Sequence, residues 1–117
     1  SYATAEKSVA DYTIRDLQGA LIGGIQHGHY MVALVTIDTS SGTLNIGGAG
    51  HWVAIDGVTQ YGVFIINPFS NRREYYTWDS FYASFHSSEA AYVELIPPPD
   101  QIKVPTYRTL PNPTTPL

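Results

Sequence analysis

The chain has 117 residues, of which 44% are hydrophobic and only 14% are charged, as in a single globular domain and unlike a disordered chain. Its net charge is -4 and its six lysines and arginines are scattered, so we expect no nucleic-acid partner. The longest apolar run, residues 30–37, is too short to span a membrane, and we expect no membrane partner. The absence of cysteine excludes disulfides and thiolate chemistry within the chain and leaves the redox compartment open.

The first third of the chain predicts helix and then strand. Residues 3–12 suggest a short helix without a marked apolar face. Thr13 and Asp16 form an approximate capping box, with aspartate where glutamate or glutamine is usual, and predict the start of a firmer helix. Glycines weaken and end that helix, and residues 30–38 then predict a strand inside a sheet. The helix carries an apolar stripe at helical spacing, formed by Ile14, Leu17, Leu21 and Ile25.

A β-hairpin is predicted in the middle of the chain, after a loop at residues 39–50 that is rich in Ser, Gly and Asn. Its strands are residues 51–56 and 63–67. A turn centred on Thr59 pairs residue 51 with 67, 53 with 65 and 55 with 63. His51 and Asn67 then lie side by side on one sheet face, whereas a one-residue slip would place them on opposite faces.

The remainder predicts a turn at residues 68–73, a short strand around Tyr75 and Tyr76, a brief aromatic helix capped by Thr77, and a strand at residues 91–96. Three prolines stop that strand, and the proline-rich residues 97–117 read as a tail or linker. This order predicts one α+β domain over residues 1–96, an antiparallel sheet with flanking helices.

His51 and Asn67 are the candidate catalytic residues. An amide beside an imidazole can orient the ring for general-base chemistry. A second interpretation is structural, a histidine at a strand end next to an Asn-Pro turn that closes the hairpin. Trp52 is interpreted as core on the opposite face of the sheet.

Other polar and aromatic residues favour structural roles. His27 and His29 form an H-x-H pair that can bind metal on a strand, but no third ligand lies nearby, so a polar loop is favoured and we expect neither metal nor cofactor. His86 is predicted to be exposed at a helix end. The aromatic residues 75–85 are interpreted as core, with Tyr75 and Tyr76 the best candidates for exposure in a groove.

Several of these segments together resemble the second half of papain-like cysteine peptidases, in particular the branch that processes double-glycine leaders of bacteriocins. They are a helix, the strand YMVALV, a variable loop, GHWVAIDGV, YGVFIINP and the aromatic helix WDSFYASF. The resemblance spans about residues 13–96. It implies that His51 is the general base, that Asn67 orients it and that the WDSF helix is structural. It also favours an extracellular or cell-envelope location.

The chain departs from that family because it lacks the nucleophilic cysteine and the preceding glutamine, and there is no room for their helix before Thr13. Three explanations remain open. The cysteine lies upstream or in another chain, since a chain beginning at Ser1 without methionine reads as a processed or expressed segment. Alternatively, the domain has lost catalysis and serves as a binding or scaffold module. The third and weakest explanation is that Ser1 acts as an N-terminal nucleophile.

We therefore expect a partial or inactive papain-like domain that contributes the His and Asn of a Cys-His-Asn triad. Completed by an external cysteine, it would cleave a peptide or amide bond in a peptide or protein substrate. The alternative is a non-catalytic binding or scaffold module with the same fold. Because a sheet half without its helical half exposes apolar surface, we also expect a partner chain or self-association to cover it.

Overall fold

The structure, a computed structural model, describes residues 3–101 and contains one six-stranded sheet, two α-helices and a short 3-10 helix. Neighbouring strands are all antiparallel, in the order β1-β6-β2-β3-β4-β5. The strands are β1 (Ala3–Ser8), β2 (Tyr30–Ile37), β3 (Ala49–Val58), β4 (Gly62–Asn67), β5 (Arg72–Thr77) and β6 (Ala91–Ile96). The helices are α1 (Ile14–Gln26), α2 (Trp78–Ser87) and the 3-10 turn η1 (Pro99–Gln101).

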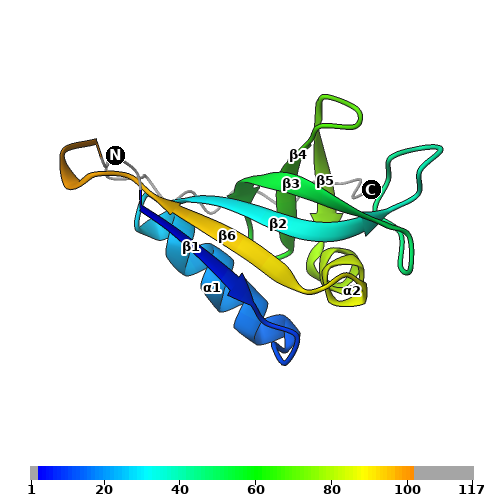
Figure 1. The fold of residues 1–117 in the computed structure, drawn as a ribbon, viewed down its shortest axis with the longest axis horizontal. Coiled ribbons are helices and arrows are strands. Elements are labelled where there is room, and N and C mark those ends of the chain that lie inside the picture. The colour runs from blue at the N-terminus through cyan, green and yellow to red at the C-terminus, as the bar shows by residue number, and fades with distance from the viewer. Residues whose placement is uncertain (1–2, 102–117) are drawn as a thin grey trace.

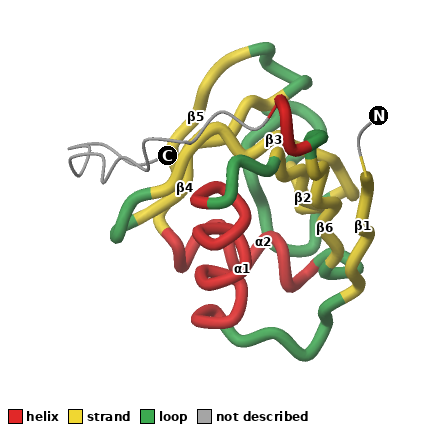
Figure 2. Tube along the Cα trace, turned by 90° about the vertical axis from the view of Figure 1, so that its left-hand side faces the viewer, coloured by secondary structure: helices red, strands yellow, loops and turns green. Residues whose placement is uncertain are grey.

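Both α-helices lie on the same side of the twisted sheet (Figures 1 and 2). The predicted α+β class with an antiparallel sheet and flanking helices is therefore confirmed. Residues 102–117, most of the predicted proline-rich tail, lie outside the described residues. Within the described part of the chain, neither helix is both long enough and apolar enough to cross a membrane.

The predicted helix at residues 3–12 is wrong, because residues 3–8 form the edge strand β1. β1 pairs with β6 along its whole length, from Ala3 opposite Ile96 to Ser8 opposite Ala91. The ladder continues through the Val9 amide, which donates to the Ala90 carbonyl at 2.7 Å. A six-residue segment without an apolar helical face gains more from these inter-strand hydrogen bonds than from helix propensity, which is a weak preference.

Helix α1 begins at the predicted capping box. The Thr13 hydroxyl accepts from the Asp16 amide at 3.2 Å, and the Asp16 carboxylate accepts from the Thr13 amide at 3.0 Å. Of the three glycines expected to weaken and end the helix, Gly23 and Gly24 lie inside it, and Gly28 follows its end at Gln26 with a φ of +77°. A Cβ at Gly24 would lie 2.5 Å from the sulfur of Met31, so the end of that flexible side chain would have to move to accommodate it.

Thr13→Ala is expected to lower the free energy of unfolding by about 0.5–2 kcal/mol, because the first turn of α1 then loses its side-chain acceptor. Urea denaturation of the variant and the parent chain measures the difference. Thr39→Ala, the same change at an exposed loop residue, is the control and is expected to be neutral. Equal stabilities for the two variants would show that the box contributes nothing.

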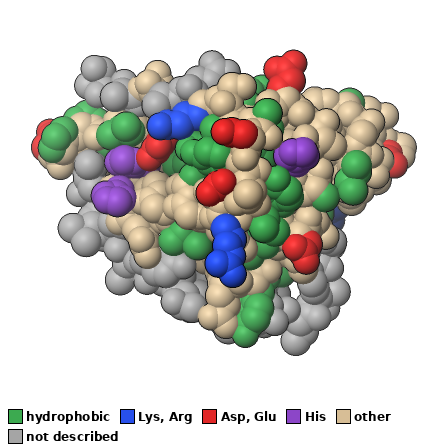
Figure 3. All heavy atoms as spheres, turned by 90° about the horizontal axis from the view of Figure 1, so that it is seen from below, with side chains coloured by type: hydrophobic (Ala, Val, Ile, Leu, Met, Phe, Trp, Pro, Cys, Tyr) green, Lys and Arg blue, Asp and Glu red, His purple; other side chains and the backbone are tan. Residues whose placement is uncertain are grey.

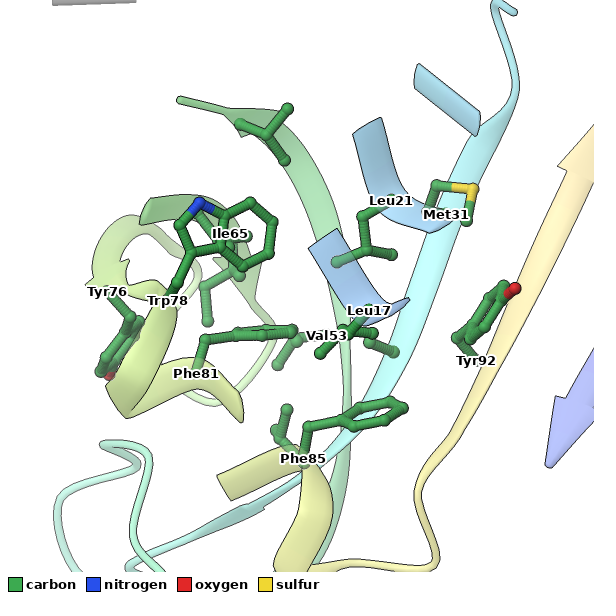
Figure 4. Packing of buried hydrophobic residues seen from close by; sticks show 14 of the residues in the cluster. Leu17, Leu21, Met31, Val53, Ile65, Tyr76, Trp78, Phe81, Phe85 and Tyr92 are labelled. Carbon is green, nitrogen blue, oxygen red and sulfur yellow. The ribbon is translucent and has the colours of Figure 1, made fainter. Parts of the chain in front are cut away.

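The core lies between the helices and the sheet. Leu17 and Leu21 of α1 and Phe81 and Phe85 of α2 are fully buried, and they point toward the strands (Figure 4). The predicted core role of the aromatic helix is confirmed for Trp78, Phe81 and Phe85. Tyr75 and Tyr76, the best candidates for exposure in that set, are both buried. Tyr76 belongs to the core, and Tyr75 lies on the other face, where its ring packs against Phe64 at 4.8 Å between centroids.

Helix α2 also completes the edge of β2. β6 pairs with β2 only at residues 30–33, so the next backbone groups of β2 would lack partners on that side. The Ser84 hydroxyl accepts from the Thr36 amide at 2.9 Å and donates to the Thr36 carbonyl at 2.7 Å, and Ser88 donates to the Leu34 carbonyl at 3.2 Å. These hydrogen bonds hold β2 in place, and Val35 of β2 is the residue that pairs with His51 of β3.

Candidate functional site: a histidine held by a buried asparagine

The hairpin exists, but its predicted pairing is wrong by three residues next to the turn and by two residues from Ile55 onward. Ile55 lies opposite Ile65, and Val58 lies opposite Val63. The chain reverses between Thr59 and Gly62, because the Thr59 hydroxyl accepts from the Tyr61 and Gly62 amides at 2.9 and 3.0 Å. The turn is therefore centred beyond Thr59. From Ile55 toward His51 the shift is an even number of residues, so the side chains of that segment keep their predicted face.

A β-bulge at Asp56 places the two candidate residues on the same face. Next to the turn, the numbers of paired residues sum to 121. If this pairing continued along the hairpin, residues 51 and 67 would lie on opposite faces of the sheet, because their numbers sum to an even value. Between Ile55 and Gly57 one extra residue enters β3, and beyond it the sum is 120. His51 and Asn67 then share a face. Gly57 inside a strand pattern was the available sequence signal for this bulge.

His51 and Asn67 are in hydrogen-bonding contact, as predicted. The His51 Nε2 atom lies 2.9 Å from the Asn67 Oδ1 atom. Because residue 54 pairs with residue 66, Asn67 lies opposite Val53 of β3. His51 is two residues before Val53 and is therefore the diagonal neighbour of Asn67. His51 is half-buried at the end of an apolar face, and Asn67 is fully buried.

The other hydrogen-bond partners of Asn67 determine which nitrogen of the neutral His51 ring carries the proton. The Asn67 Nδ2 atom donates to the Gly42 carbonyl at 2.8 Å and to the Glu74 carboxylate at 3.1 Å, while Oδ1 accepts from the Phe69 amide at 3.0 Å. The atom that faces His51 is therefore an oxygen, and Nε2 must donate to it. The lone pair of a neutral ring then lies on Nδ1, which is the nitrogen able to accept a proton.

Glu74 also belongs to this site, although no pattern in the amino-acid sequence singles it out. It lies on β5 opposite Ile65 and is 8% exposed. Its carboxylate accepts from Asn67, from the Tyr76 hydroxyl at 3.0 Å and from the Ser70 hydroxyl at 2.9 Å. Three donors thus satisfy a buried carboxylate. A charged residue between Arg73 and Tyr75 reads as an ordinary strand residue, so only the three-dimensional pairing reveals its role.

Tyr76 connects Glu74 to the loop between β2 and β3. Its hydroxyl donates to Glu74 and accepts from the Leu44 amide at 3.3 Å. Burial raises the pKa of Tyr76 to about 12. The hydrogen bond from the Leu44 amide lowers this pKa, whereas the hydrogen bond to Glu74 and the charge of Glu74 raise it further. The phenol therefore remains a hydrogen-bond donor at neutral pH.

Two exposed apolar side chains lie on the loops around Asn67. The Phe69 ring packs directly over Gly42, where a Cβ would lie 2.2 Å from the ring and where φ is +77°. Phe69 is nevertheless 49% exposed, and Ile46, on the same loop as Gly42, is 68% exposed. Phe69, whose amide donates to Asn67, is therefore an exposed apolar side chain beside the site, whereas the neighbours of Ile46 bond to Thr36 and Ser87.

Trp52 lies on the opposite face from His51, as predicted, but the expectation that it belongs to the core is wrong because it is 39% exposed. Together with Leu34, its partner on β2, it lines a shallow groove of about 580 Å³. Gly50 and Ser88 also border the groove. Since neither His51 nor Asn67 lines it, this groove is separate from the candidate site.

His27 and His29 follow helix α1, and each ring contacts a neighbouring group of the protein. The His27 ring contacts the Gly23 carbonyl at 2.6 Å at the end of α1, and the His29 ring contacts the Glu94 carboxylate. Among residues 3–101, no group of three His, Cys, Asp or Glu side chains could hold a metal ion. His86 is exposed near the end of α2. On the face seen in Figure 3, charges of both signs are scattered and form no single basic patch.

The chain matches no protein-family model, no curated protein and no solved structure. The fold and the site define an α+β domain in which a buried asparagine holds a half-buried histidine at the open end of a hairpin.

Proposed function

We propose that this domain supplies the general base and the orienting amide of a papain-like cysteine peptidase site, with the cysteine contributed from outside these 117 residues. The observation that carries the proposal is the His51–Asn67 hydrogen bond, which leaves Nδ1 as the basic nitrogen. An imidazole whose second nitrogen is held by an amide is the arrangement that papain-like triads require. The helix, strand and hairpin order resembles that family over about residues 13–96.

The chemistry follows from this geometry. A cysteine thiol placed against His51 Nδ1 would transfer its proton to that nitrogen, and the thiolate would attack the carbonyl carbon of a peptide or amide bond. The imidazolium would then return the proton to the leaving amine. Water would hydrolyse the resulting thioester: His51 would take a proton from the attacking water and return it to the cysteine sulfur as the carbon–sulfur bond breaks. Throughout these steps Asn67 keeps Nε2 engaged, so the ring presents the same nitrogen each time.

A second polypeptide segment or chain is part of the proposal, because the chain contains no thiol. The exposed side chain of Phe69 borders the site and would be covered by the segment that brings the cysteine. Self-association is the other means of covering it. The proposed substrate is a peptide or protein, bound without nucleic acid or membrane.

A non-catalytic binding or scaffold module is the second candidate function. The absence of any cysteine favours it, since His51 without an activated nucleophile can act only on water. In that case the hydrogen bonds of Asn67 close the hairpin, and the exposed Phe69 contacts a partner directly.

Peptide hydrolysis separates the two candidates. The coding sequence upstream of Ser1 is first read for a glutamine and a cysteine on one helix, and the polypeptide that includes them is assayed with a peptide library. The proposal expects cleavage by this longer polypeptide and none by the 117-residue chain. No cleavage by a folded longer polypeptide would favour the binding module.

A further inference from the structure

We propose that Glu74 is the positioning residue of this site, the acceptor that holds Asn67 and thereby keeps the free lone pair of His51 on Nδ1. The inference relies on the proposed function for its chemical meaning, but its test needs no nucleophile. Glu74 touches neither His51 nor the place of the reacting atoms, and it acts through Asn67.

All four hydrogen-bonding positions of the Asn67 amide are used. Oδ1 accepts from His51 and Phe69, and Nδ2 donates to Gly42 and Glu74. Rotation of this amide by half a turn would present Nδ2 to the ring, which would then have to carry its proton on Nδ1. The position of the ring proton therefore depends on the partners that hold the amide.

Glu74 differs from the other partners because it belongs to the regular sheet. Gly42 lies in the loop between β2 and β3, and Phe69 lies in the turn between β4 and β5, whereas Glu74 lies within the β5 ladder. Its hydrogen bond to Asn67 is also charge-assisted, and such bonds are roughly twice as strong as neutral ones.

The carboxylate of Glu74 supports the two other partners as well. Its bond with Tyr76 holds the hydroxyl that accepts from the Leu44 amide, two residues from Gly42. Its bond with Ser70 holds the residue next to Phe69. Loss of this single acceptor thus loosens every neighbour that fixes the amide, including those that do not touch Glu74.

The test measures the ring tautomer in the isolated chain. Long-range proton–nitrogen correlation spectra of ¹⁵N-labelled protein, recorded where the ring is neutral, distinguish a protonated from a bare ring nitrogen. We expect the wild-type His51 to have a protonated Nε2 and a bare Nδ1. In Glu74→Leu, which keeps a side chain without an acceptor, we expect the two nitrogen signals to move toward each other as the second tautomer appears.

Two variants serve as controls. Glu74→Gln retains an oxygen that accepts from Asn67 and Tyr76, and its amide nitrogen can donate to the Ser70 hydroxyl, so its spectrum is expected to match the wild type. Glu89→Leu makes the same change as Glu74→Leu at an exposed position and is also expected to match. A folded Glu74→Leu protein with the wild-type tautomer, or a Glu74→Gln spectrum like that of Glu74→Leu, would overturn the inference.

If Glu74→Leu does not fold, the wild-type chain still decides the question. Both Nδ2 protons of Asn67 are expected to exchange slowly with water, because Gly42 and Glu74 accept them in a buried site. Exchange as fast as that of the exposed Asn45 side chain would overturn the inference. Failure of peptide cleavage would leave these readouts unchanged, so the two proposals fail separately.

Discussion

Asn67→Asp is expected to lower the free energy of unfolding by about 3–5 kcal/mol at neutral pH, because it introduces an uncompensated charge into a buried site. The new carboxylate would face the Glu74 carboxylate and the Gly42 carbonyl, both of which now accept from the Asn67 Nδ2 atom. Three acceptors would then meet without a proton between them.

The loss should depend on pH in a defined direction. Two carboxylates that share a site raise the pKa of one of them above its unfolded value of about 4. The folded variant then binds more protons than the unfolded chain in that window, so its stability falls as pH rises through it. The difference from wild type should therefore be smaller at about pH 4 than at about pH 7.

Guanidinium denaturation at the two pH values measures this effect. Asn45→Asp adds the same charge at an exposed position of the adjacent loop and is expected to change the free energy of unfolding little at either pH. If Asn67→Asp were as stable as Asn45→Asp at neutral pH, the buried contact between Asn67 and Glu74 would not exist in solution.

Phe81→Ala is expected to cost about 3–5 kcal/mol of stability, a large part of the roughly 5–15 kcal/mol available to a domain. Phe81 is fully buried in α2, with its ring edge-on to Trp78 and stacked on Phe85 at centroid distances of 6.5 and 6.3 Å. Its loss would leave a cavity between the helices and the sheet (Figure 4).

Thermal and urea unfolding measure this cost, and Phe69→Ala is the control. The same substitution at Phe69, which is about half exposed, removes less buried surface and should have a much smaller effect. Equal losses for the two variants would place Phe81 outside the core.

Local sequence patterns predicted most of the fold because they reflect local physics. The Thr13 capping box, the Thr77 cap of α2 and the apolar strand at residues 30–38 each appear where predicted, within a residue or so. The strand β1 was missed because its structure depends on pairing with β6, which is far away in the sequence. The exposure of Trp52 likewise depends on what covers the outer face of the sheet.

The candidate site was predictable in part. The prediction that His51 and Asn67 share one face was right because two unpredicted changes of register compensated each other. The turn and the bulge at Asp56 each altered the register, and together they preserved the face. Glu74 was not predictable, because its meaning arises only where β5 lies beside β4 and Tyr76 reaches the loop.

The central claim is that His51 is a general base. Its most direct test uses the polypeptide that carries both this domain and the cysteine, and it measures the rate at which a cysteine-directed electrophile labels that polypeptide. His51→Ala is expected to slow labelling by about 100- to 10,000-fold, the usual contribution of a positioned base. His86→Ala, at an exposed histidine of α2, is expected to label at the wild-type rate. Equal labelling of the wild type and His51→Ala would contradict the claim.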